Sequence, residues 1–185
     1  MARSKVLLID NDVLSHFAAT GHLEDLSTIL EKHTIMLVDK VYSEAKKFRG
    51  DPMRIQKIDA WIKARAIHII TITKPVGSYQ MQEYLRLGRE CPALDDGERA
   101  ICACAKHGGE VVVSSNFRDV KDYCEQNKIE YIGTMDVLKI AMGKGIWTDV
   151  DCNKFISEAI HINSARFPCG DINKYIPTRD LSEYM

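Results

Sequence analysis

The sequence lacks every short motif that would fix a zinc site or a disulfide frame. None of its six cysteines forms a CxxC pair, and its six histidines show neither HxH nor HExxH spacing. Cys102 and Cys104 are two residues apart in a predicted helix, so their side chains diverge by roughly 200° and cannot bind one ion. We therefore expect buried, reduced thiols in a cytoplasmic protein.

Long hydrophobic runs and an excess of basic charge are also missing. The apolar run near the N-terminus ends at Asp10, and no segment approaches the ~18 apolar residues of a membrane helix. The net charge of -1 excludes a strongly basic nucleic-acid module and a polybasic membrane binder. Basic residues are nevertheless concentrated in one stretch, which either contacts an RNA backbone or forms a solvated helix face. Its members are Lys46, Lys47, Arg49, Arg54, Lys57, Lys63 and Arg65.

The sequence does contain enough apolar residues for one folded domain. It has 185 residues, 45% hydrophobic and 28% charged, so it can bury a substantial core without disulfides or structural metal. Apolar, β-branched runs predict strands at 5–9, 34–38, 66–73, 110–115 and 129–133. Helical periodicity predicts helices at 12–19, 22–32, 39–48, 53–65, 78–89, 97–106, 117–128 and 134–143.

The alternation of these elements predicts an α/β fold, a three-layer α/β/α sandwich around a mainly parallel sheet. We expect this domain to span residues 1–145 and a helical, irregular extension to follow over residues 146–185. The helix of the extension is predicted to bury a stripe formed by Phe155, Ile156, Ala159 and Ile160. Ligand sites in such folds lie beyond the carboxyl ends of the strands.

Acidic residues follow the predicted strands at this end of the sheet. Asp10 and Asp12 come directly after the first strand, and Glu44 follows the second. Further polar side chains open the helix at 97–106 or follow the strand at 110–115: Asp95, Asp96, Glu98, Asn116 and Asp119. Each residue alone also fits a simple role as a helix cap, a first-turn acid or a surface ion-pair partner. The functional hypothesis depends on their joint placement.

Carboxylates gathered in one pocket would repel one another, and desolvation would raise their pKa values. Mg²⁺ or Mn²⁺ would relieve this repulsion, because hard cations prefer oxygen ligands. Such an ion suits phosphodiester hydrolysis, since it activates water and neutralises charge in the transition state. Ser114 and Ser115 are expected to line the pocket rather than act as nucleophiles, because no base is evident beside them.

The order of these features resembles the PIN-domain family of metal-dependent nucleases. The resemblance covers residues 5–145 and is carried by LLIDNDVLSHF, MLVDKVYSEAKK, LDDGERAICACAKHGG and VVVSSNFRDVKDYCEQNKIEYIGTMDVLKIAMGKG. It implies a Rossmann-like α/β/α sandwich whose acidic residues bind Mg²⁺ or Mn²⁺ and cleave RNA.

The resemblance also assigns roles to individual residues. The expected catalytic residues, which also bind the metal, are Asp10, Glu44 and Glu98. Asp95 or Asp96 could take the place of Glu98, and Asp12 occupies a position that aids metal binding. Asn116 stands where relatives commonly carry Asp, so it would bind the ion without adding charge. Asp119 lies one helical turn further on and would compensate.

Many small PIN proteins are the toxins of toxin–antitoxin pairs. The resemblance therefore implies an endoribonuclease with RNA as substrate, an antitoxin as partner and a homodimer as assembly. A second hypothesis is a catalytically weak PIN module that binds RNA or a partner protein; Asn116 and the 146–185 extension favour it. A third, a response-regulator-like receiver, is disfavoured because the strand EVVVSS ends in serine where a phosphorylatable Asp is required.

Overall fold

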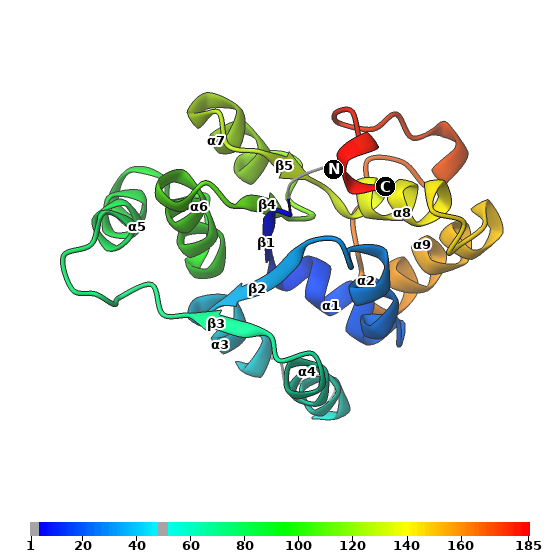
Figure 1. The fold of residues 1–185 in the computed structure, drawn as a ribbon, viewed down its shortest axis with the longest axis horizontal. Coiled ribbons are helices and arrows are strands. Elements are labelled where there is room, and N and C mark those ends of the chain that lie inside the picture. Colours follow the sequence, from blue (N-terminus) through cyan, green and yellow to red (C-terminus); the bar gives the residue numbers. More distant parts are fainter. Residues whose placement is uncertain (1–3, 48–51) are drawn as a thin grey trace.

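A parallel five-stranded sheet forms the centre of the molecule (Figure 1). The computed structural model describes residues 4–47 and 52–185. The strands are β1 (Val6–Ile9), β2 (Thr34–Val38), β3 (His68–Ile70), β4 (Val111–Val113) and β5 (Tyr131–Ile132). Their order is β3-β2-β1-β4-β5, and every neighbouring pair is parallel. The predicted α/β fold class is confirmed.

Helices cover both faces of this sheet. In the described part of the chain they are α1 (Asn11–Ala19), α2 (Leu23–Ile29), α3 (Asp39–Lys47), α4 (Pro52–Ala64), α5 (Tyr79–Glu90), α6 (Asp96–Gly108), α7 (Asp119–Asn127), α8 (Thr134–Gly143) and α9 (Asp149–Asn163). Two short 3₁₀ turns follow, η1 (Ile172–Lys174) and η2 (Ser182–Tyr184). Every helix expected from the sequence is present, with its ends shifted by a few residues.

Successive strand residues alternate between two cores. Leu7 and Ile9 of β1 pack in a core with α1, α2, α4, α8 and α9. Leu8 packs in the second core, against α5, α6 and α7. This alternation follows from the two-residue period of a strand. Because both faces of the sheet are covered, its strands appear in the sequence as continuous apolar runs.

Two expectations about apolar segments were wrong in detail. The strand predicted at 66–73 is limited to His68–Ile70, because it is an edge strand paired only with β2 and the chain then enters a turn. Ile160 is 45% exposed, whereas Cys152, Phe155 and Ala159 are buried. The buried stripe of α9 thus begins one turn earlier than predicted, and Ile160 lies beside it.

The C-terminal segment lies against α8 (Figure 1). Phe155 of α9 packs on Phe17 of α1 with a ring-centroid separation of 4.7 Å. Near the end of the chain, Lys5 forms an ion pair of 2.5 Å with Glu183. The extension therefore contributes to the first core. No helix in the described residues is long and apolar enough to cross a membrane.

Candidate active site

The sheet order reverses at β1, and Asp10 follows this strand directly. β2 and β3 lie on one side of β1, while β4 and β5 lie on the other. A binding crevice is expected beyond the carboxyl ends of the strands at such a reversal. The Asp10 amide donates to the Val113 carbonyl at 2.9 Å, which joins the ends of β1 and β4. Asp10 is only 3% exposed.

Two donors fix the Asp10 carboxylate. It is the N-cap of α1, since Oδ1 accepts a hydrogen bond of 2.7 Å from the Asn11 amide. The Ser114 hydroxyl donates to Oδ2 at 2.6 Å. Burial, followed by the charge of Asp12, holds the pKa of Asp10 well above its usual range, although the Ser114 hydrogen bond opposes this shift. Asp10 is therefore both a helix cap and a buried carboxyl group whose ionised form is unfavourable.

Glu44 extends from α3 to the N-terminus of α6. Its Oε1 accepts a hydrogen bond of 2.7 Å from the Gly97 amide. A Cβ at residue 97 would lie 2.5 Å from Glu44 Oε2 and 3.2 Å from Val41 Cγ2, so this approach requires glycine. Burial, and then the charge of Asp95, raise the pKa of Glu44 to about 7.

Glu98 joins α6 to the loop after β4. With Asp95 it forms a capping box: the Glu98 amide donates to Asp95 Oδ1 at 2.8 Å, and the Asp95 amide donates to Glu98 Oε2 at 2.9 Å. The other oxygen, Oε1, accepts from Asn116 Nδ2 at 2.8 Å. Burial raises the pKa of Glu98, although the hydrogen bond from Asn116 lowers it in part.

Asp95, rather than Asp96, faces the other acids. Its charge contributes to the raised pKa values of four carboxyl groups, those of Asp10, Asp12, Glu44 and Glu98. Asp96 instead accepts from Tyr84 at 2.6 Å and from Arg99 at 2.9 Å. Burial alone would raise the pKa of Asp96, but these hydrogen bonds outweigh it and the pKa is lowered. The Asp96 side chain thus bonds to Tyr84 and Arg99, although its charge also contributes to the raised pKa of Glu44.

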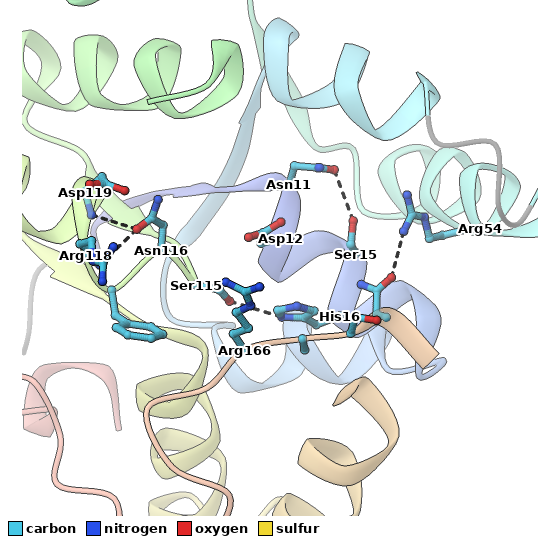
Figure 2. Close-up of a pocket in the computed structure, with 14 residues that line it drawn as sticks. Asn11, Asp12, Ser15, His16, Arg54, Ser115, Asn116, Arg118, Asp119 and Arg166 are labelled. Atoms are coloured by element: carbon cyan, nitrogen blue, oxygen red, sulfur yellow. Dashed lines mark hydrogen bonds between the residues drawn. The ribbon is translucent and has the colours of Figure 1, made fainter. Parts of the chain in front are cut away.

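A cavity of about 570 Å³ opens at the start of α1 and the loop after β4, and Asp10, Glu44 and Glu98 themselves do not line it (Figure 2). Asp12, Asn116 and Asp119 line it, as do three cationic side chains: Arg54, Arg118 and Arg166. Figure 2 shows Asp12 between the loop that carries Asn116 and the side of the cavity formed by Arg54, while Arg166 enters from the C-terminal segment. The cavity thus combines carboxylates with guanidinium groups.

Asn116 shapes the loop between β4 and α7. Its Oδ1 accepts from the amides of Arg118 and Asp119 at 3.1 and 3.0 Å, while its Nδ2 donates to Glu98. The Asn116 amide in turn donates to Ser114 Oγ at 3.1 Å. The side chain therefore connects the strand that ends beside Asp10 with the helix that carries Glu98.

His16 and Ser115 form a polar wall of the same cavity. His16 is 4% exposed, and burial, followed by the charge of Arg54, lowers its pKa to about 4, so the imidazole is neutral near pH 7. Its Nδ1 lies 3.3 Å from Ser115 Oγ. The i, i+4 spacing from Asp12 to His16 could have placed His16 at the site, but the extension gave no sequence signal for Arg166.

Among the described basic residues at 46–65, Arg54 is the one that lines this cavity. Arg54 also donates to Asn163 Oδ1 at 3.4 Å. Arg65 instead pairs with Glu24 of α2 at 2.5 Å. Arg49 lies outside the described residues. The idea that the whole stretch contacts an RNA backbone therefore stays a prediction.

Residues 4–47 and 52–185 contain no group of three or more His, Cys, Asp or Glu side chains that is already arranged to hold a metal ion. The chemistry of the available donors nevertheless fits Mg²⁺ or Mn²⁺. They are hard carboxylate oxygens, and the raised pKa values of Asp10, Glu44 and Glu98 show that their negative charges lack compensation. A bound cation would supply it.

The fold and this site define a Rossmann-like α/β protein with an acidic crevice at its topological switch point. A family model described as a PIN domain, DUF3368, matches residues 6–167. The chain belongs to the PIN-domain family, as the sequence motifs indicated.

Two solved structures resemble the fold. One is a chain of VapBC2 from Rickettsia felis, bound to a DNA fragment from their promoter, with 14% identity and a TM-score of 0.52 over 69% of this chain and 98% of that chain. The other is a chain of FitAB bound to an IR36 DNA fragment, with 15% identity and a TM-score of 0.44 over 69% and 94%. No curated protein matches the sequence.

Proposed function

We propose that this protein is a metal-dependent endoribonuclease. The proposal is carried by one observation: carboxylates that are far apart in the sequence converge at the ends of β1 and β2 and the start of α6, and burial raises their pKa values. PIN domains are generally nucleases, so membership of the family supports a hydrolase.

The groups we propose as ligands of Mg²⁺ or Mn²⁺ are carboxylates and one amide. They are Asp10, Glu44, Glu98, Asp12, Asn116 and Asp119, with Asp95 in place of Asp96. Three of them, Asp12, Asn116 and Asp119, line the cavity, whereas Asp10, Glu44 and Glu98 lie outside its lining. When bound, the ion would activate a water molecule and neutralise charge on the phosphate.

The side chains of the protein would orient the metal ligands and bind the phosphates of the RNA. Ser114 and the Asn11 amide hold the Asp10 carboxylate, and Gly97 holds Glu44, so both acids keep fixed orientations. Arg118 and Arg166 line the cavity and are suited to bind phosphate oxygens of the RNA, since guanidinium groups form charge-assisted hydrogen bonds with phosphate.

We further propose that the chain is the toxin of a toxin–antitoxin pair, active as a homodimer in the cytoplasm. The likeness in fold to a chain of VapBC2, which was solved bound to a DNA fragment from their promoter, supports this role. An antitoxin with a basic segment would suit the acidic residues of the cavity, Asp12 and Asp119.

A catalytically weak module that binds RNA or a partner protein is the second candidate. Asn116 favours it, because this residue brings no charge and uses its amide to bind Glu98. Such a module would bind RNA without forming any product at any concentration of Mg²⁺ or Mn²⁺.

Cleavage of a mixed RNA during a Mn²⁺ titration separates the two candidates. Asp10→Asn should lower the cleavage rate about 100-fold or more, because a ligand charge is lost. Asn is also a good N-cap, so the variant should fold. Asp122→Asn, on the exposed side of α7, is the matched control and should cleave normally. Undiminished cleavage by Asp10→Asn would overturn the proposal.

A further inference from the structure

A second cavity, of about 410 Å³, lies between the loop after β4, the N-terminus of α8 and the C-terminal segment. Its volume is in the range of pockets that hold small organic groups. Aromatic side chains contribute much of its wall: Phe117, Tyr131, Phe167 and Tyr175. Neither the metal ligands nor the proposed chemistry uses this space.

The second cavity adjoins the cavity of the candidate active site. Ser115, Phe117 and Arg166 line both cavities. A chain molecule that places one group beside the carboxylates can therefore place the next group in the second cavity. Lys121 also lines the second cavity, so cationic side chains lie at both ends of this path.

The aromatic walls offer ring surfaces rather than free hydroxyl groups. The Tyr131 hydroxyl donates to the Ser114 carbonyl at 2.6 Å, and the Tyr175 hydroxyl donates to Asp136 Oδ1 at 3.0 Å. Phe117 is 46% exposed. Planar rings next to guanidinium and ammonium groups are the surfaces on which unstacked bases of single-stranded RNA bind.

We propose that the second cavity is a nucleobase subsite that binds the base next to the cleaved phosphate of a single-stranded RNA. This inference rests on the proposed function and deepens it. Phe117 provides the stacking surface at the boundary of the two cavities. Arg166 binds the intervening phosphate, and the C-terminal segment closes the subsite through Phe167 and Tyr175.

The experiment compares binding of intact and abasic RNA by protein variants that keep or lose the Phe117 ring. An Asp10→Asn background prevents cleavage, so that binding of short, labelled RNA oligonucleotides is measured in Mn²⁺ with and without Phe117→Ala. In each oligonucleotide one base at a time is replaced by an abasic ribose. Tyr79→Ala is the control, because Tyr79 is an exposed aromatic residue on α5 that lines neither cavity.

In the Asp10→Asn protein that keeps Phe117, removal of the bound base should weaken RNA binding about 10-fold. Phe117→Ala should weaken binding of intact RNA by about the same factor. The two losses should not add, because each removes the same stacking contact. Phe117→Tyr should restore binding. Independent losses, or an abasic scan with no sensitive position, would overturn the subsite.

These results are distinguishable from those that test the nuclease. If the wild-type protein cleaves no RNA but the abasic position and Phe117 remain coupled, the proposed catalysis fails and the subsite stands. If cleavage is normal and no coupling is found, the subsite fails alone.

Discussion

The Asn116 side-chain amide donates a hydrogen bond of 2.8 Å to Glu98 Oε1. An aspartate at this position would place a second carboxylate against Glu98, whose pKa is already raised by burial. It would still accept the amide hydrogen bonds that Asn116 Oδ1 receives from Arg118 and Asp119. The amide therefore removes one negative charge from the cluster without changing the loop.

Asn116→Asp should destabilise the metal-free protein by about 1–2 kcal/mol and strengthen Mn²⁺ binding, because the added charge is compensated only by a cation. Thermal unfolding with and without Mn²⁺, together with calorimetric titration, measures both effects. Asn116→Ala is the control, since it removes the hydrogen bonds and adds no ligand. If Mn²⁺ raises the unfolding temperature of Asn116→Asp no more than it raises that of the wild type, the prediction is wrong.

Glu44 makes the stability of the metal-free protein dependent on pH. Its pKa is raised from 4.5 to about 7, so folding favours the protonated carboxyl. Stability should fall as the pH rises through this interval and stay low above pH 7. Glu44→Gln keeps an acceptor for the Gly97 amide but cannot ionise. The variant should therefore lose about 1 kcal/mol less stability than the wild type between pH 5 and pH 8, after a discount for solvent screening. Unfolding from pH 5 to pH 8 checks it.

The same pH series in Mn²⁺ supplies the control for Glu44. A bound cation should favour the ionised carboxylate and reverse the slope in the wild-type protein, and less so in Glu44→Gln. A slope that Mn²⁺ leaves unchanged would show that Glu44 does not face the ion.

The fold and part of the site could be predicted from the sequence because they depend on local patterns. Buried parallel strands are continuous apolar runs, and Asp10 follows the first of them directly. Whether Asp95 or Asp96 joins the set stayed open at the sequence level, because it depends on the side to which each side chain turns. Only the capping box with Glu98 directs Asp95 into the cluster.

Contacts between distant segments could not be predicted. The requirement for Gly97 appears only when α3 packs on α6 and brings Glu44 within 2.7 Å of its amide. Arg166 belongs to a segment without periodicity, and its place in the cavity depends on how the C-terminal segment packs against α1 and the loop after β4. Such long-range packing leaves no local signal.

Asp136 anchors the C-terminal segment to α8. It is fully buried and accepts from the Gly133 amide, the Tyr175 hydroxyl, and both the amide and hydroxyl of Thr178, at 2.7–3.0 Å. Asp136→Asn would set an amide group against these donors, which should cost about 3 kcal/mol. Limited proteolysis should cut the segment sooner, and RNA affinity should fall as Arg166 is released.

Asp180→Asn is the matched control for this anchor. Asp180 is exposed, and its side chain accepts hydrogen bonds from the neighbouring Ser182. This variant should leave proteolysis and RNA affinity unchanged. Equal protease resistance in Asp136→Asn and the wild type would show that the segment is held by its apolar contacts alone.

Glu83 of α5 connects three helices, and its contact on α6 is Lys106, near the C-terminal end of that helix. It is 7% exposed and accepts from Arg86 at 2.6 Å, from Lys106 of α6 at 2.9 Å and from Tyr123 of α7 at 2.6 Å. The hydrogen bond from Arg86, aided by those from Tyr123 and Lys106, lowers the pKa of Glu83 well below 4.5. The ionised form therefore stabilises the fold at neutral pH.

Because this pKa is lowered on folding, the stabilisation is present above pH 4.5 and is lost as the pH falls through the folded-state pKa. Glu83→Gln should lower the free energy of unfolding by about 2 kcal/mol at pH 7. The difference should shrink as the pH falls below 4.5, because the carboxyl of the unfolded chain becomes protonated there and the ionised form loses part of its advantage on folding. Denaturant unfolding at pH 7 and pH 2 measures this convergence. RNA cleavage should be unchanged under conditions in which both proteins are folded, because Glu83 lines neither cavity.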